Sequence, residues 1–155
     1  MNPCQPFDAA TEICILVDRK LAILNSLLQH GIQQQRLIQA GDADQLMSLL
    51  ARKQSHLQEL VDVQETLGVL LERHDEATLR WRSPQQRAEC KQRIDHCNAL
   101  GHEVLQLEGD CVQMAQRKRD AIAAQVQEFS SFRSSSSRTS SLNDQTHLAQ
   151  FDESS

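Results

Sequence analysis

Apolar residues recur at intervals of three and four along most of this 155-residue chain, which is the spacing of one face of an α-helix. That spacing is interrupted at two places, near Gly41 and near Ser83. Aromatic residues make up only 3% of the chain and glycines number five, which argues against β-sheets and against the Gly-rich turns of α/β proteins. The sequence therefore predicts an all-α protein: an elongated up-and-down bundle of three long amphipathic helices, with four as the alternative count.

The first interruption predicts the end of one helix and the start of another. Gly41 suits the left-handed position that follows a helix, because it has no Cβ to clash. Asp42 suits an N-cap, and Gln45 stands three residues later at the capping-box position. We expect helices over residues 11–40 and 43–74; a single helix bent at Gly41 is the alternative. The first apolar stripe comprises Ile13, Val17, Leu21, Leu24, Leu28, Gly31, Gln35 and Ile38, and the second Leu46, Leu50, Leu57, Leu60, Leu67 and Leu71.

The second interruption predicts the start of a third helix. Ser83 can be its N-cap, and Pro84 occupies the first helical position, where a missing N–H costs nothing. We expect this helix over residues 84–129, with heptad-like steps. Its apolar positions are Cys90, Ile94, Cys97, Leu100, Val104, Leu107, Cys111, Met114, Ile122, Val126 and Phe129.

The C-terminal stretch differs in composition from the helices. Residues 130–155 are dominated by serine and contain few apolar side chains to bury. Because burial must offset the entropy of ordering, we expect a disordered tail there.

Charge and hydropathy argue against two classes of partner. The formal net charge is −5, whereas nucleic-acid-binding proteins usually carry a basic face. The longest apolar stretch is interrupted by Asp18, Arg19 and Lys20, so membrane insertion is not expected. No signal-peptide pattern is visible at the N-terminus, and the five cysteines form no disulfide-like framework. These features favour a cytoplasmic protein.

The sequence contains no motif that is typical of a catalytic or metal-binding site. Two metal ligands on one helix must stand three or four residues apart, and no pair among the cysteines and histidines of the third helix does so. Glu-x-x-His pairs, nucleophile motifs and phosphate-binding glycine loops are absent from the sequence. We therefore expect no enzyme activity, catalytic residue, cofactor or metal, and interpret Cys90, Cys97 and Cys111 as small buried residues.

Trp81, the only tryptophan, lies in the connection between the second and third helices beside Arg80 and Arg82. It is either a plug that packs onto the end of the bundle or an anchor for a partner.

The predicted helices differ in length. At 1.5 Å per residue, the first two would be about 45–48 Å long and the third about 69 Å. The last turns of the third helix would then lack a partner in the monomer, and Ile122, Val126 and Phe129, with Phe132 nearby, would form an exposed apolar stripe. These four residues are the predicted partner-binding site; the alternative is that this end folds back on a neighbour or frays.

One segment resembles a known family. The run QQQRLIQAGDADQLMSLLARKQSHLQELVDVQ, Gln33–Gln64, resembles the N-terminal half of FlgN-type flagellar export chaperones. In both, a helix ends near Gly-Asp and is followed by leucines, a lysine and more leucines. The matching residues are Leu37, Gly41, Asp42, Leu46, Leu49, Leu50, Lys53, Leu57 and Leu60.

The resemblance implies a cytoplasmic, all-helical chaperone that is a monomer or weak homodimer. It would bind hook–filament junction proteins by helix–helix contact near its C-terminal end and keep them unassembled for flagellar type III export, delivering them to the export apparatus. The alternative is a homo-oligomeric coiled-coil adaptor or structural protein unrelated to flagella.

Overall fold

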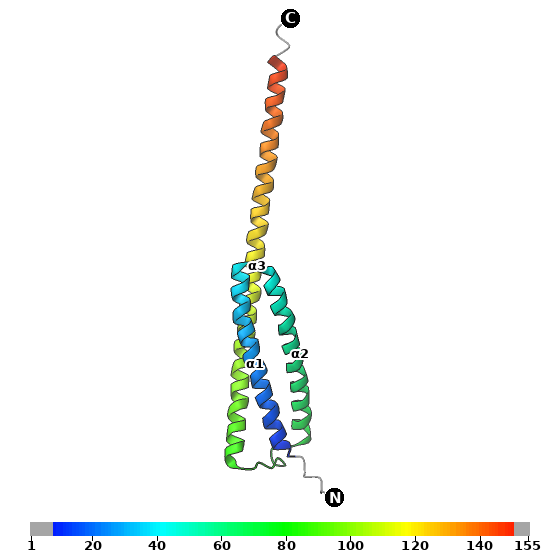
Figure 1. Ribbon diagram of the computed structural model, residues 1–155, viewed down its shortest axis with the longest axis vertical. Helices are drawn as coiled ribbons and strands as arrows, with labels where there is room; N and C mark the ends of the chain where they lie inside the picture. The colour runs from blue at the N-terminus through cyan, green and yellow to red at the C-terminus, as the bar shows by residue number, and fades with distance from the viewer. Residues whose placement is uncertain (1–7, 151–155) are drawn as a thin grey trace. The chain divides into compact units, whose positions relative to one another are not determined.

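The computed structural model describes residues 8–150, with side chains described as far as residue 138. Its elements are three helices, α1 (Ala9–Ala40), α2 (Ala43–Arg73) and α3 (Pro84–Gln150), and the described part of the chain contains no strand (Figure 1). The all-α prediction is confirmed. The chain divides into two units, one ending at Met114 and the other beginning at Ala115.

A C-terminal cap on α1 is followed directly by an N-terminal cap on α2. Gly41 adopts φ 71°, in the left-handed region. Its N–H donates to the carbonyl of Ile38 (3.2 Å) and the N–H of Asp42 donates to that of Leu37 (3.1 Å), which is the Schellman pattern. The Asp42 carboxylate accepts from the N–H of Gln45 at 3.1 Å and caps α2. The helix therefore ends and restarts here, as predicted, and does not merely bend.

The start of α3 is capped in a similar way. Ser83 Oγ accepts from the N–H of Gln86 at 3.1 Å, and Pro84 is the first helical residue. The side chain of Gln86 reaches back to accept from the N–H of Arg82 at 2.8 Å. Both predicted capping residues, Ser83 and Pro84, lie where the sequence placed them.

The third helix does not end at residue 129. Helix α3 continues through most of the serine-rich stretch to Gln150, while residues 151–155 lie outside the described part. After Gly109 the sequence has no glycine, and after Pro84 no proline, that could terminate the helix. Serine hydroxyls also bond within the helix: Ser134 Oγ donates to the carbonyl of Ser130 at 2.8 Å.

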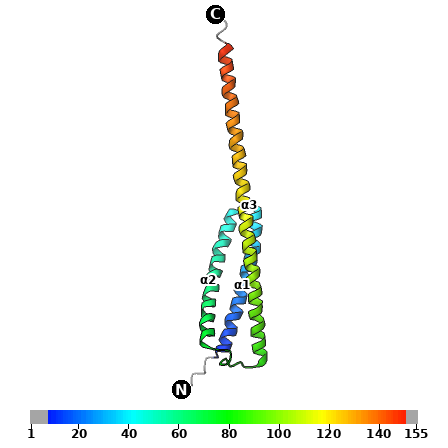
Figure 2. The same ribbon diagram turned by 180° about the vertical axis from the view of Figure 1, so that it is seen from behind.

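Within the first unit the chain runs up, down and up, so α2 is antiparallel to its neighbours and α3 is parallel to α1 (Figures 1 and 2). Sulfur contacts set the α1–α3 register. Cys97 Sγ lies 3.7 Å from the carbonyl of Val17, and Cys111 Sγ lies 3.7 Å from that of Gly31. A Cβ on Gly31 would lie 2.5 Å from Leu107 Cδ2, so glycine allows a closer approach of the two helices here.

The buried residues differ in part from the predicted stripes. On α1, Leu27 and Gln34 are buried in place of the predicted Leu28 and Gln35. On α2, Leu49 and Lys53 are buried, whereas the predicted Leu46 and Leu50 are only half-buried and the predicted Leu57 and Leu71 are exposed. A helix that packs against two neighbours buries a broader arc than one stripe, which explains the shift. The main core cluster comprises Ile13, Cys14, Val17, Ile23, Leu24, Leu27, Val63, Leu67, Cys90, Cys97 and Leu100.

Candidate protein-binding surface

The predicted partner-binding residues form an exposed apolar stripe on the second unit, which we call the distal stripe: Ile122, Val126, Phe129 and Phe132. Their exposed fractions are 59%, 60%, 66% and 73%. The first three stand four and three residues apart and therefore share one helix face. Every described side chain from residue 115 to residue 138 is exposed, so this unit buries none of the stripe against itself. An exposed helical stripe of large apolar residues is typical of a protein-binding surface.

Basic residues accompany the distal stripe. Lys118 and Arg119 lie one turn before Ile122, and Arg133 lies one turn after Phe129. The guanidinium of Arg119 contacts the carboxylate of its exposed neighbour Asp120 at 3.4 Å. In water such a pair contributes little, so the side chain keeps its freedom to meet another charge. The surface therefore suits an amphipathic partner whose apolar face is bordered by acidic residues.

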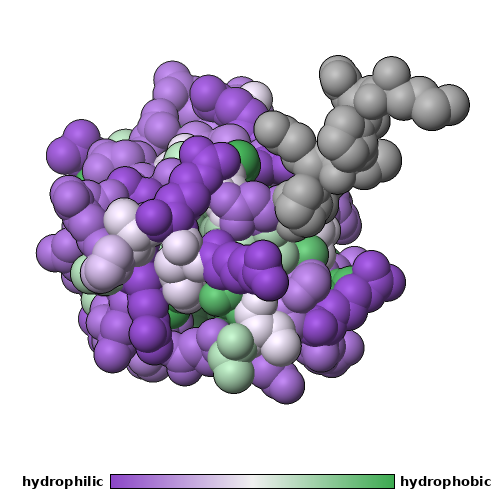
Figure 3. Space-filling view, turned by 90° about the horizontal axis from the view of Figure 1, so that it is seen from below, coloured by the Kyte–Doolittle hydropathy of each residue, from purple (hydrophilic) through white to green (hydrophobic). Residues whose placement is uncertain are grey.

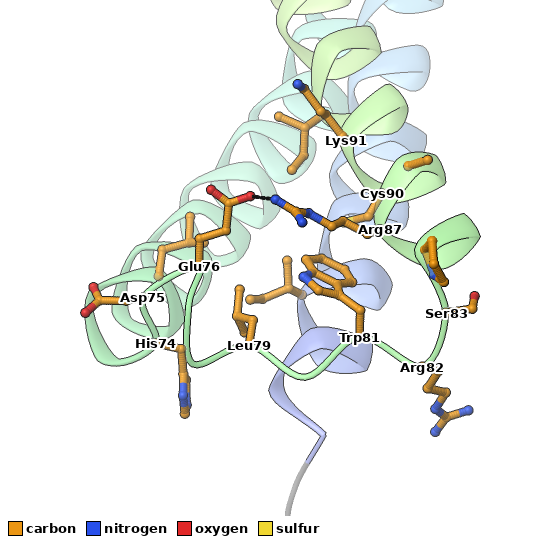
Figure 4. A pocket seen from close by; sticks show the side chains of 15 residues that line it. His74, Asp75, Glu76, Leu79, Trp81, Arg82, Ser83, Arg87, Cys90 and Lys91 are labelled. Carbon is orange, nitrogen blue, oxygen red and sulfur yellow. Dashed lines mark hydrogen bonds and ion pairs between the residues drawn. The ribbon is translucent and has the colours of Figure 1, made fainter.

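Trp81 packs against the main core cluster from the connector between α2 and α3, together with Leu79. Its indole points into the hollow at this end of the bundle, beneath Arg87 (Figure 4). The indole Nε1 is buried and has no hydrogen-bond partner among the described residues. The packing agrees with the plug that the sequence suggested, while the unused N–H leaves a donor inside the hollow.

The cysteines of α3 are buried among apolar side chains, as predicted. Burial raises the pKa of the Cys90 thiol to about 12, and a hydrogen bond with the neighbouring Cys14 thiol adds to this. Burial likewise raises the pKa of Cys97 and Cys111. The three thiols are therefore protonated near neutral pH, a state that disfavours nucleophilic attack and metal binding. Within residues 8–138 no three His, Cys, Asp or Glu side chains cluster as metal ligands would.

A buried polar cluster links all three helices and was missed at the sequence level. Lys53 on α2 is 5% exposed; its Nζ donates to Gln34 Oε1 on α1 at 2.8 Å and forms an ion pair with Glu108 on α3. The available signal was position: Lys53 stands four residues after Leu49 and would share its helix face. Both partners of the ammonium come from other helices, so the sequence spacing alone could not reveal them.

Comparison with models of known protein families, with curated proteins and with solved structures finds no match for the chain. No helix, in its described residues, has an apolar run long enough to cross a membrane. The surface chemistry of the two units is therefore the basis for a functional proposal.

Proposed function

We propose that this protein is a cytoplasmic export chaperone that binds hook–filament junction proteins by helix–helix contact and keeps them unassembled for flagellar type III export. The observation that carries the proposal is the distal stripe. Four large apolar side chains are exposed on a helical unit that gives them nothing to pack against. Burying such side chains against a partner helix would contribute about 1.5–3 kcal/mol each.

Two further features support the proposal. The segment Gln33–Gln64, which resembles the export-chaperone family, includes the Gly41–Asp42 double cap and the buried Lys53. The α3 thiols are buried, and the distal stripe with its basic neighbours offers a partner apolar and charged side chains. A chaperone that binds without changing its cargo needs only such a surface.

The test is size-exclusion chromatography with light scattering, on the protein alone and mixed with a hook–filament junction protein. We expect a monomer or weak dimer alone and a defined mixed complex. Replacing Val126 and Phe129 together by serine should weaken the complex by at least about tenfold. Because neither side chain is buried, the thermal melting of the bundle should be unchanged.

A matched control uses exposed apolar residues of the same helix in the other unit. Leu105 and Val112 are 70% and 49% exposed on the part of α3 that belongs to the bundle. Their joint replacement by serine should leave the complex intact. Equal loss of binding in both double variants would remove the site assignment, and no mixed complex at all would remove the proposal.

The second candidate is a homo-oligomeric coiled-coil adaptor or structural protein unrelated to flagella. The exposed distal stripe favours it as well, because two copies can bury this stripe against each other, whereas the heptad-spaced cysteines are already buried within the bundle. A tight homo-oligomer at low micromolar concentration, dissociated by the Val126/Phe129 double variant, would identify this function in place of the chaperone.

A further inference from the structure

A second apolar surface lies in the bundle itself, between α2 and α3. Two neighbouring hollows, of about 1120 and 250 Å³, share Ile13, Leu71 and Ile94 in their linings and thus form one continuous groove. The larger volume slightly exceeds the range of about 300–1,000 Å³ that is usual for ligand-binding clefts. Figure 3 looks onto this end of the bundle, where apolar side chains are visible in a hollow between polar ones.

Each helix contributes a row of side chains to this groove at helical spacing. The floor comes from α1, and the walls come from α2 and α3. Leu71 and Ile94 face the groove and remain 53% and 38% exposed, although each belongs to an apolar stripe of its helix. The residues that define the groove are Ile13 and Lys20 on α1, Gly68 and Leu71 on α2, and Lys91 and Ile94 on α3.

The shape of the groove matches a helix. Two antiparallel helices with a third beneath them leave a trough that a fourth helix fills in a four-helix bundle. Gly68 deepens the trough on the α2 side, because a Cβ there would meet no atom within 4 Å. From Lys91 to Asn98 the α3 wall spans about 10 Å, or two helical turns, and Trp81 extends the apolar lining beyond Lys91.

The charges of the groove indicate the chemistry of its occupant. Arg87 pairs with Glu76 across the larger hollow (Figure 4), and Arg82 pairs with Asp8 at 3.0 Å. Lys20 and Lys91 also line the groove, and neither ammonium has a carboxylate partner among the described residues. Asp75, an acid of the lining, lies at the connector end, whereas Lys20 lies on α1 at the floor and Lys91 on the α3 wall. An acidic partner would complete the pairing.

A second copy of this chain is a poor match for the groove. Its exposed apolar stripe is accompanied by Lys118, Arg119 and Arg133, which would bring cations towards Lys20 and Lys91. Juxtaposed like charges oppose association.

We propose that the groove between α2 and α3 binds an amphipathic helix of another protein, which inserts large apolar side chains between Leu71 and Ile94 and presents acidic residues to Lys20 and Lys91. This site is separate from the distal stripe and does not rest on the proposed export function. The protein would then have two protein-binding surfaces, one on each unit.

The experiment uses the full chain and two synthetic stapled helical peptides of about 14 residues, since unstapled helices of this length are marginal in water. Both peptides carry leucines at positions i, i+3 and i+7. One has glutamates on the flanks and the other has lysines at the same places. Binding is followed by peptide fluorescence anisotropy and by the emission of Trp81, the only tryptophan of the chain.

Two glycine variants separate the groove from the rest of the surface. Gly68→Leu fills the groove, whereas Gly109→Leu adds the same side chain to an exposed helical glycine that lines neither hollow. Neither added Cβ meets an atom within 4 Å, and leucine favours helix more than glycine does, so both variants should melt no lower than the wild type.

We expect the acidic peptide to bind saturably and to change the Trp81 emission. Gly68→Leu should weaken it by at least about tenfold. Lys91→Glu should weaken it several-fold and favour the basic peptide. Gly109→Leu and the Val126/Phe129 double variant should both show the wild-type change in Trp81 emission with the acidic peptide. Because Trp81 lines the groove and is not part of the distal stripe, this readout distinguishes the groove from the site used by the proposed chaperone function.

Three outcomes would overturn the inference. They are equal binding of both peptides, binding that Gly68→Leu does not change, and absence of saturable binding by the acidic peptide up to about 1 mM. If the wild type instead forms a homodimer that Gly68→Leu dissociates, the occupant is a second copy and the inferred partner is wrong.

Discussion

In the bundle, α3 buries Cys90, Cys97 and Cys111, whereas between residues 115 and 138 the same helix leaves Ile122, Val126 and Phe129 exposed. Both stretches carry apolar residues at helical spacing. The difference is that α1 and α2 supply neighbours to the first stretch, while the second unit supplies none. Apolar spacing therefore indicates which face of a helix is available for packing, and neighbouring elements determine whether that face is buried.

The groove between α2 and α3 is intermediate between these two cases. Ile94 belongs to the same apolar stripe as Cys90 and Cys97, yet it is 38% exposed while they are buried. The side of the stripe that faces α1 is covered by that helix, whereas the side that faces the groove is only partly covered. One helix thus shows a covered, a partly covered and an uncovered surface along its length.

The largest difference in stability between the two units is expected when one large apolar side chain in each is replaced by alanine. Leu27 is 1% exposed in the core, so Leu27→Ala should lower the free energy of unfolding by about 2–5 kcal/mol. Phe129→Ala should change it by no more than about 0.5 kcal/mol. Chemical denaturation followed by circular dichroism measures both. If Phe129→Ala were as costly as Leu27→Ala, the distal stripe would be packed in the free protein and the contrast between the units would fail.

A smaller effect is expected from the buried ion pair. Removing the carboxylate with Glu108→Ala leaves the buried ammonium of Lys53 with the neutral Gln34 amide as its acceptor. Because the Glu108 side chain is 42% exposed, water can replace part of the interaction, and we expect a loss of about 1–3 kcal/mol.

Two further variants serve as controls for the ion pair. The double variant Lys53→Met/Glu108→Ala removes both charges and should recover most of the loss, as a double-mutant cycle would show. Glu128→Ala, an exposed carboxylate in the second unit, should have no measurable effect. An unchanged stability of Glu108→Ala would mean that Lys53 reaches water in solution.

The smallest effect concerns pH. Burial lowers the pKa of His30 below its usual value of about 6.5, and the positive charges of His56, Arg52 and Lys53 lower it further. The unfolded chain therefore takes up the proton first as the pH falls. This His30 contribution is fully present above about pH 6.5 and is lost progressively below it, until the folded state also becomes protonated.

Thermal melts between pH 7.5 and 5.5 test this expectation. The melting temperature should fall as the pH is lowered from 7.5 to 5.5, and His30→Gln should make this fall smaller. The stretch 115–138 has no histidine, so its helicity should not follow the same titration. A wild-type slope that His30→Gln leaves unchanged would assign the pH dependence to other groups.

The sequence by itself determined the helices, their caps and the location of the distal stripe. Such features depend on local chemistry: Gly41 at a left-handed position, Asp42 and Ser83 as caps, and apolar residues in step with the helix period. The burial of the three α3 cysteines also followed from that period. The predicted end of α3 at residue 129 is wrong, because serine enrichment alone does not end a helix and no glycine or proline stops it there.

Only the tertiary structure decided which residues of each stripe become buried, that Lys53 meets Gln34 and Glu108, and that a groove remains between α2 and α3. These depend on the register and separation of helices that are far apart in sequence. Helix period is a property of neighbouring residues, whereas register results from many weak contacts across the bundle, such as those of Gly31 with Leu107 and Cys111.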